Sequence, residues 1–370
     1  MTATVQLLNL DLPALEQFFH DIGERPFRAR QLMQWVYRRG VLDFAAMSDL
    51  AKGLREKLAA VADLTLPAVA KKQVSADGTR KLLLELEDGR RIETVLIPDG
   101  ERLTQCISSQ VGCAMGCDFC RTGSGGLERN LSAAEIVGQV VLGQALAVAQ
   151  SRITISPDSE IARAVGTPEG RAPGMGRVTN VVFMGMGEPL HNLENVLRAF
   201  FILSSDHGLN ITRRRLTVST CGVVDGLLRL PSEVLPSLAV SLNATTDAVR
   251  DRIMPVNRRW PIAELLGTLR ELPLPQRARY TIEYVLLGGV NDTPEDARRL
   301  VRLLSDLRCK VNLIAYNPHP ESSYRAPEPG AVEAFQTHLL EKNFTAVLRK
   351  SRGQDILAAC GQLKAETRDA

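Results

Sequence analysis

Between residues 100 and 350 the chain repeats one pattern: a short apolar run rich in β-branched residues, a polar turn, and a longer helical stretch. The apolar runs are Val178–Met184, Leu216–Ser219, Leu238–Leu242, Thr281–Leu287 and Lys310–Ala315. Helical stretches such as Ala133–Val148 and Pro294–Leu307 lie between such runs. Alternating strands and helices predict an α/β fold with a parallel sheet and right-handed crossovers.

Polar or glycine-rich turns follow nearly every predicted strand. These turns are Gly185-Met186-Gly187-Glu188, Ser219-Thr220, Ser241-Leu242-Asn243 and Asn317-Pro318. Each residue taken alone is more often a helix cap or a turn residue than a ligand contact. In β/α barrels, however, the chemistry occurs at the carboxyl ends of the strands. Their joint placement therefore predicts a site at that end of the sheet.

The segments on either side of this core predict accessory regions. Residues 1–70 have helical spacing of apolar side chains and form a predicted small helical domain with a basic rim. Within it we expect helices over Arg28–Arg39 and from Ser48 to about Ala60. Residues 71–99 form a predicted linker with a β-hairpin, because Asp88-Gly89 separates two alternating apolar runs.

Two further segments lie outside the repeating pattern. Residues 151–177 are rich in Gly, Pro, Ser and Arg without apolar periodicity, which is typical of a surface insertion. Residues 351–370 form a separate C-terminal segment that contains one cysteine, Cys360.

Four of the seven cysteines fall within fifteen residues, and three of them form a C-x3-C-x2-C motif at Cys113, Cys117 and Cys120. Three thiolates can bind three irons of a [4Fe-4S] cluster and leave the fourth iron open for another ligand. Structural zinc is the alternative, but it prefers four ligands, often in paired C-x2-C units. The nearest fourth candidate, Cys106, stands at a different spacing.

Charge and hydropathy exclude some classes of protein. The net charge is only +3, so an RNA-binding surface requires local clustering of Lys and Arg. The sequence has no apolar run long enough for a membrane span and no secretory signal pattern, so we expect a cytoplasmic protein. It also has no Walker-type phosphate loop, and its five histidines form no ligand pattern.

The cysteine triplet, including Phe119 before its last cysteine, resembles that of the radical S-adenosylmethionine (SAM) superfamily. The resemblance implies a partial (β/α)6 TIM-like barrel in which SAM binds the open iron and is cleaved to a 5′-deoxyadenosyl radical. It also implies that the strand-end turns bind SAM. The residues concerned are Gly187, Glu188, Ser219, Ser241, Leu242, Asn243 and Asn317.

Longer motifs resemble the dual-specificity RNA methyltransferases of the RlmN type. They are Pro26–Gln31, Ile92–Val95, Cys106–Cys113, Met184–Leu190 and Arg352–Leu363. The match covers nearly the whole chain except the insertion and the last few residues. One departure is Asn243, where some relatives carry His. The resemblance implies methylation of C2 of adenosine in 23S rRNA and in the tRNA anticodon loop, by a monomer that takes electrons from a donor such as flavodoxin or ferredoxin.

The same resemblance assigns roles to three residues outside the triplet. Cys360 takes a methyl group from one SAM, and a second SAM supplies the radical that activates this methyl group for addition to C2. Cys106 removes the C2 proton and forms a disulfide with Cys360, which releases the methylated RNA. Glu93 corresponds to a general acid/base. Read from the sequence alone, Glu93 would be an ordinary carboxylate at a hairpin edge.

Other interpretations remain open at this point. A related enzyme methylates C8 of the same adenosine and shares both outlying cysteines. Other radical SAM enzymes, or a zinc-containing RNA-binding protein, are further alternatives. The candidate RNA contacts are Arg28, Arg30, Arg38, Arg39 and the run Arg213–Arg215. We expect the remaining cysteines, Cys221 and Cys309, to be small apolar core residues.

Overall fold

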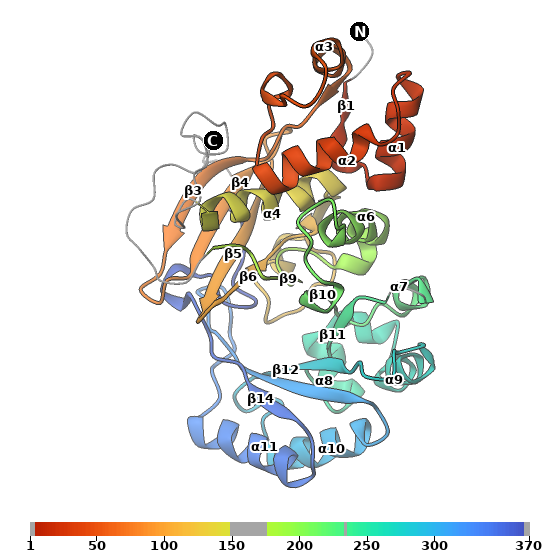
Figure 1. The fold of residues 1–370 in the computed structure, drawn as a ribbon. Coiled ribbons are helices and arrows are strands. Elements are labelled where there is room, and N and C mark those ends of the chain that lie inside the picture. The colour runs from red at the N-terminus through yellow and green to blue at the C-terminus, as the bar shows by residue number, and fades with distance from the viewer. Residues whose placement is uncertain (1–3, 149–175, 233–234, 366–370) are drawn as a thin grey trace.

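The computed structural model describes residues 4–148, 176–232 and 235–365. Its centre is a ten-stranded sheet (Figure 1). Seven neighbouring strands of this sheet are parallel: β6 (Arg102–Cys106), β9 (Asn180–Phe183), β10 (Leu216–Thr220), β11 (Ser237–Ser241), β12 (Tyr280–Leu286), β13 (Cys309–Ala315) and β14 (Ala346–Leu348). The predicted α/β fold with a partial barrel is confirmed.

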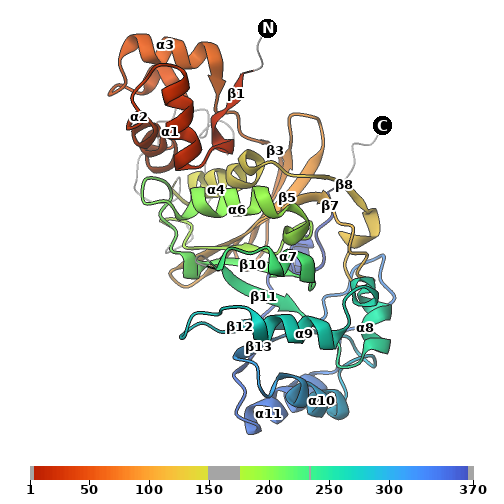
Figure 2. The same cartoon turned by 90° about the vertical axis from the view of Figure 1, so that its right-hand side faces the viewer.

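Helices cover the outer face of these parallel strands (Figure 2). They are α4 (Ala133–Val148), α6 (Leu193–Ser204), α7 (Val224–Leu228), α8 (Asp247–Ile253), α9 (Ile262–Glu271), α10 (Pro294–Leu304) and α11 (Pro329–Glu341). Local sequence explains where they begin. In α10, Thr293 and Asp296 form a capping box and Pro294 occupies the first turn, so the helix starts where the sequence predicts.

The N-terminal region packs against α4 and α6 (Figure 2). It contains α1 (Leu12–Asp21), α2 (Arg28–Met33), which continues as a π-helical turn over Gln34–Arg38, and α3 (Lys52–Val61). The strands β1 (Val5–Gln6) and β2 (Ala62–Asp63) pair in parallel and close this region. Its buried leucines join the same apolar core as the barrel. The predicted second helix therefore exists, but it begins at Lys52 rather than at Ser48.

The predicted hairpin is part of the main sheet. The strands β3 (Ala68–Val74), β4 (Arg80–Glu85) and β5 (Arg91–Asp99) are antiparallel, and β5 pairs with the first barrel strand, β6. Glu93 on β5 and Cys106 on β6 thereby lie on neighbouring strands. A small hairpin of β7 (Gln110–Gly112) and β8 (Leu127–Asn130) encloses the cysteine motif.

Two predicted features need separate mention. The predicted insertion at 151–177 lies outside the described residues except for its last two. Within the described residues, every helix is too short or too polar to cross a bilayer.

Candidate active site

The carboxyl ends of the parallel strands surround a chamber. Among its lining residues are the three motif cysteines and most of the predicted strand-end residues. They are Cys113, Cys117, Cys120, Gly187, Glu188, Ser219, Ser241, Asn243 and Asn317. Because parallel strands end at one edge of the sheet, turns far apart in the sequence meet there.

The three motif cysteines lie in the loop between β7 and β8. Cys113 is anchored by its N–H, which donates to the carbonyl of Gly126 at 2.7 Å, and Cys120 by a 3.0 Å bond to the carbonyl of Cys117. Burial raises the pKa of the Cys113 thiol to about 12, so binding a metal there requires release of the proton.

This donor set suits an iron–sulfur cluster better than a single zinc ion. Within the described ranges, no three His, Cys, Asp or Glu side chains converge as one metal ion requires. A zinc ion holds its thiolates within about 2.3 Å of one centre, whereas a four-iron cluster separates its ligands further. The three cysteines line one chamber without converging on a single centre, and they therefore fit an iron–sulfur cluster.

Glu188 lies beside the three cysteines and is 1% exposed. Its carboxylate accepts hydrogen bonds from the N–H groups of Leu190 at 3.0 Å and Cys221 at 2.7 Å. Burial nevertheless raises its pKa, because these bonds do not fully replace water. Gly187 has φ +103°, and a Cβ atom there would lie 2.6 Å from Cβ of Gln110, so only glycine fits this turn.

The neighbouring strand ends are held by one buried arginine, Arg250. Its guanidinium donates to the carbonyls of Cys221, Ser241 and Leu242 at 2.7, 3.1 and 3.0 Å. The Leu242 side chain is fully buried and does not line the chamber, unlike Ser241 and Asn243 on either side. Of the predicted contacts in this turn, Leu242 can therefore contribute only through its backbone.

Cys221 is not the core residue that the sequence predicts. It follows β10, lines the chamber, and its sulfur lies 3.9 Å from that of Cys117. The sequence could have indicated this position, because Cys221 directly follows the predicted strand-end turn Ser219-Thr220. Cys309, in contrast, is buried at the start of β13, away from the chamber, as predicted.

A second chamber adjoins the first beside the C-terminal segment. Cys106, Thr104 and Ile97 line it from the β5–β6 side, and residues 347–352 and 358–360 line it from the other side. Met184, Asn317, Arg349 and Cys360 line both chambers. Cys360 therefore stands at the boundary between the chamber of the three motif cysteines and the chamber of Cys106.

Arg349 places a positive charge at this boundary. Proximity to Cys360, above all, and to Glu283 raises the pKa of its guanidinium although the side chain is half-buried. Burial, followed by the proximity of Cys360, raises the pKa of Cys106 to about 12. Arg349 was not predicted as a site residue, because it follows the end of β14, a strand that the sequence analysis did not predict.

The segment that carries Cys360 is held by contacts on both sides. Toward the cysteine motif, the N–H of Arg121 donates to the carbonyl of Gly361 at 2.8 Å, and the hydroxyl of Thr122 donates to that of Leu363 at 2.6 Å. At the other end of the segment, the N–H of Gly353 donates a hydrogen bond at 3.1 Å to the carboxylate of Asp77, in the turn between β3 and β4. Cys360 is thus fixed next to the motif loop.

Glu93 takes part in this anchoring. One oxygen pairs with the ammonium of Lys81 at 2.9 Å and the other accepts the N–H of Lys364 at 2.9 Å, with both paired side chains buried. Lys81 also donates to the carbonyl of Leu357 at 3.3 Å. Burial raises the pKa of Glu93, and the charge of Lys81 opposes this shift. Glu93 lines neither chamber.

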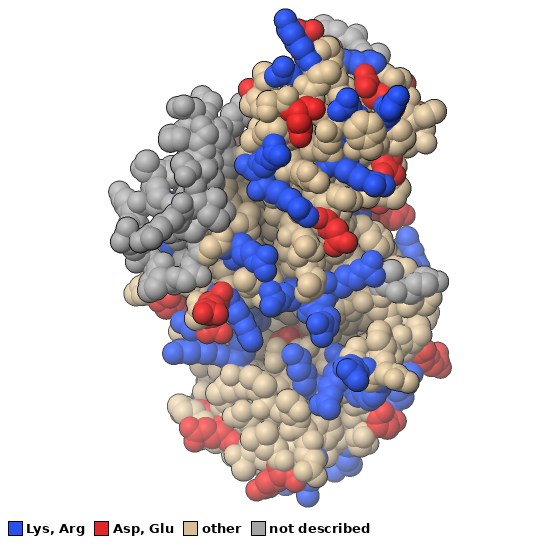
Figure 3. Space-filling model, viewed as in Figure 1, with Lys and Arg blue, Asp and Glu red and all other residues tan. Residues whose placement is uncertain are grey.

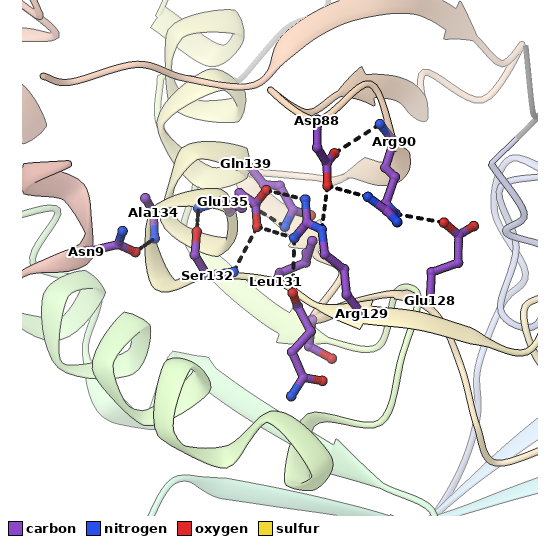
Figure 4. Close-up of polar contacts among 12 residues, drawn as sticks. Asn9, Asp88, Arg90, Glu128, Arg129, Leu131, Ser132, Ala134, Glu135 and Gln139 are labelled. Carbon is purple, nitrogen blue, oxygen red and sulfur yellow. Dashed lines mark hydrogen bonds and ion pairs between the residues drawn. The ribbon is translucent and has the colours of Figure 1, made fainter. Parts of the chain in front are cut away.

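An ion-pair network fixes the motif hairpin to the rest of the fold (Figure 4). Arg129 on β8 bonds Asp88 in the β4–β5 turn at 2.7 Å and Glu135 at the start of α4 at 2.7 Å. Hydrogen bonds to Glu135, chiefly, raise the pKa of Arg129. In the same view, Asn9 of the N-terminal region accepts the N–H of Ala134 at 2.8 Å. These contacts therefore connect the β4–β5 turn, the start of α4 and the N-terminal region with the hairpin that contains the cysteine motif.

Comparisons with known proteins cover almost the whole chain. The family model described as "Ribosomal RNA large subunit methyltransferase N-terminal domain" matches residues 5–64, and that of the "Radical SAM superfamily" matches residues 170–304. A protein of Geobacter sulfurreducens named dual-specificity RNA methyltransferase RlmN is 50% identical over 364 residues, covering 98% of this chain and 93% of the relative.

Two further comparisons agree with these matches. A protein of the same name from Pelobacter propionicus is 49% identical over 366 residues, covering 98% of this chain and 97% of the relative. The crystal structure of a radical SAM methyltransferase from Sphaerobacter thermophilus superposes with a TM-score of 0.85 at 41% identity, covering 98% of this chain and 100% of that chain.

Proposed function

Since the chain belongs to the RlmN family of dual-specificity RNA methyltransferases, we propose that it methylates C2 of adenosine in 23S rRNA and in the tRNA anticodon loop. The observation that carries this proposal is the position of Cys360 at the boundary between two chambers. One chamber has the donors for a cluster and SAM, and the other has Cys106 and room for a base.

Cys113, Cys117 and Cys120 would hold the [4Fe-4S] cluster that the radical SAM family implies. When bound, the cluster supplies the electron that cleaves SAM and so provides the radical needed at adenine C2, a carbon too electron-poor to attack a methyl sulfonium. Glu188, held against the strand end by the N–H groups of Leu190 and Cys221, is placed to accept hydrogen bonds from the amino group of SAM.

Cys360 is the methyl acceptor in this proposal. Its thiolate attacks the methyl group of one SAM, and the S-methyl group that results faces the second chamber. Arg349 stabilises the negative charge of the attacking sulfur, because its half-buried guanidinium lies beside Cys360 and donates no hydrogen bond to a carboxylate in the described part of the chain. A second SAM is then consumed to activate the same methyl group.

Cys106 completes the reaction from the β5–β6 side, whereas Glu93, which lines neither chamber, supports it as a positioning residue rather than as the general acid/base that the resemblance implied. The raised pKa of Cys106 makes its sulfur a strong base once ionised, which suits removal of the C2 proton. After the adduct has given up its unpaired electron, the sulfur of Cys106 would attack that of Cys360, so that the disulfide forms as the bond between the Cys360 sulfur and the transferred carbon breaks and that carbon takes up a proton. Glu93 acts indirectly. It accepts the N–H of Lys364 and pairs with Lys81, which donates to the carbonyl of Leu357, and both contacts position the segment that contains Cys360. A reductant then restores both thiols.

The test is nucleoside mass spectrometry on rRNA and tRNA from cells without this gene and from cells with the gene restored. We expect 2-methyladenosine to disappear and return in both RNAs. If 8-methyladenosine followed the gene instead, the chain would be the C8 enzyme; if neither changed, RNA methylation by this chain would be excluded.

A further inference from the structure

The opposite end of the barrel carries a concentration of positive charge. The loops that enter β10, β12, β13 and β14 all lie at the amino ends of the parallel strands. Their exposed cations, here named the basic floor, are Arg213, Arg214, Arg215, Arg277, Arg279, Arg308 and Lys342. Figure 3 shows this face, where Lys and Arg predominate around the central hollow. The whole chain has a net charge of only +3.

These cations have no acidic partners, a property that they share with some other exposed arginines of the described chain, such as Arg39, Arg102 and Arg258, but here seven such cations lie at one end of the barrel. Across residues 4–148, 176–232 and 235–365, no ion pair joins a member of the basic floor to a carboxylate, whereas Arg90, Arg259 and Arg298 each pair with one. Asp306, two residues before Arg308, pairs with Arg270 instead. Like charges left unpaired at short range repel one another, so this face favours an anionic partner.

Part of the floor forms a hollow with a fixed shape. Arg277, Arg279, Arg308 and Lys342 line it together with uncharged polar residues and a few apolar ones, and no Asp or Glu is among the lining residues. The guanidinium of Arg308 donates to the carbonyls of Leu274 and Gln276 at 2.9 and 2.8 Å. These bonds fix the loop that contains Arg277. The side chains of the other cations that line the hollow donate no such bonds to this loop and are available to a partner.

The dimensions of the floor suit a chain of phosphates. From β10 to β14 there are four strand spacings, or about 19 Å, which spans several phosphates of an extended nucleic-acid strand. Phe344 is the one aromatic residue among those that line the hollow, and it is only partly exposed, whereas most protein interfaces depend on several aromatic or arginine anchors. Arginine forks also match phosphate oxygens in geometry.

We propose that the basic floor is a second RNA-binding surface, which contacts the phosphate backbone of a long RNA whose target adenosine lies at the other end of the barrel. The two ends are separated by strands of five to seven residues, or about 16 to 23 Å. Only an RNA long enough to pass around the barrel contacts both ends. This inference rests on the proposed function, because it takes RNA as the substrate.

The test compares two RNAs over a salt titration. The floor variant carries Arg213→Gln, Arg215→Gln, Arg277→Gln and Arg279→Gln, and the control carries Arg298→Gln and Arg302→Gln on α10, where both arginines pair with Glu295. The probes are a long 23S rRNA fragment and a short anticodon stem-loop. Thermal unfolding checks that each variant folds.

We expect the floor variant to bind the long RNA roughly tenfold more weakly, with a slope of log K against log salt smaller by about 2 to 3. The stem-loop should bind as before, and the control should match the wild type with both RNAs. An unchanged slope with the long RNA would overturn the proposal and point to an acidic protein as the partner. Failure of wild-type protein to methylate either RNA would refute the proposed function while leaving these binding measurements intact.

Discussion

The two ends of the barrel strands differ in almost every physical property. At the carboxyl ends, cysteines, a glutamate and asparagines are buried and held by backbone hydrogen bonds, as around Glu188 and Cys113. At the amino ends, arginines such as Arg213 and Arg277 are exposed and have no acidic partner in the described structure. Catalysis requires groups that are shielded from water and held in place, whereas contact with phosphates requires long side chains that are exposed to solvent. One parallel sheet supplies both.

The largest expected effect is at the carboxyl end. Cys360→Ala removes the sulfur that we propose as the methyl acceptor, so we expect no methylated RNA and no protein–RNA adduct, with RNA affinity unchanged. Product is measured by mass spectrometry and affinity by filter binding. A Cys360→Ala protein that still methylated RNA would exclude the methyl-cysteine mechanism.

Cys106→Ala separates addition from release. Without the Cys106 sulfur, the methyl carbon can add to the base but the adduct cannot resolve, so we expect a covalent protein–RNA species that survives denaturing electrophoresis. The control is the Cys106→Ala/Cys360→Ala double variant, which should form none. Normal turnover by Cys106→Ala would show that another base acts at C2.

Arg349→Met should slow methylation of Cys360 roughly 10- to 100-fold, because a charge-assisted contact to an ionised group contributes about 1.5 to 3 kcal/mol. The measurement is the mass of the C-terminal peptide after timed incubation with SAM. Arg349→Lys should recover part of the rate because it keeps the charge. Equal rates for the Met and Lys variants would assign Arg349 a packing role only.

Lys81→Met tests the anchoring of the C-terminal segment. Breaking a buried ion pair leaves Glu93 without its partner and should cost about 3 kcal/mol of local stability. Hydrogen exchange at residues 357–365 should accelerate. The Lys81→Met/Glu93→Gln double variant should recover part of that loss, since it leaves no unpaired charge. Additive losses would mean that the two side chains act independently.

The smallest expected effect concerns pH. Partial burial acts to raise the pKa of Asp77, but hydrogen bonds from Thr79 and Gly353 lower it from 3.8 to about 2. A lowered folded-state pKa stabilises the fold above pH 3.8, and this stabilisation is lost as the pH falls toward 2. Proteolysis of the 353–365 segment in the metal-free chain should therefore increase over that range. Asp77→Asn should flatten the dependence; an unchanged profile would exclude Asp77 as its origin.

The sequence predicted the fold class and the family, and both are confirmed. It succeeded because strand-end turns and the cysteine spacing are local patterns. Three strands of the main sheet were missed: β3 and β6, which have polar sequences (β6 reads Arg-Leu-Thr-Gln-Cys, and β3 contains two lysines), and β14, which is only three residues long. Their place in the sheet comes from pairing with distant strands, which no local pattern encodes.

For the site, sequence reasoning found residues but not all of their neighbours. Most predicted strand-end residues line one chamber, and Cys360 lies between the two. Arg349 and the Lys81–Glu93 pair depend on long-range packing of the C-terminal segment, so spacing could not reveal them. The run Arg213–Arg215 was visible in the sequence, but only the strand direction places it at the amino ends, away from the chamber.

The sheet does not close into a cylinder: in the described structure β14 pairs only with β13, while the other side of the barrel continues from β6 into β5. The C-terminal segment borders the second chamber on this open side. The interior of a closed barrel is open only at its two ends, so a polymer can enter it only with its own free end or as a tight hairpin. Because β14 and β6 are not paired in the described structure, we expect that one nucleotide from the middle of an uninterrupted RNA strand can reach the second chamber from this side, without any free end of the RNA having to pass through.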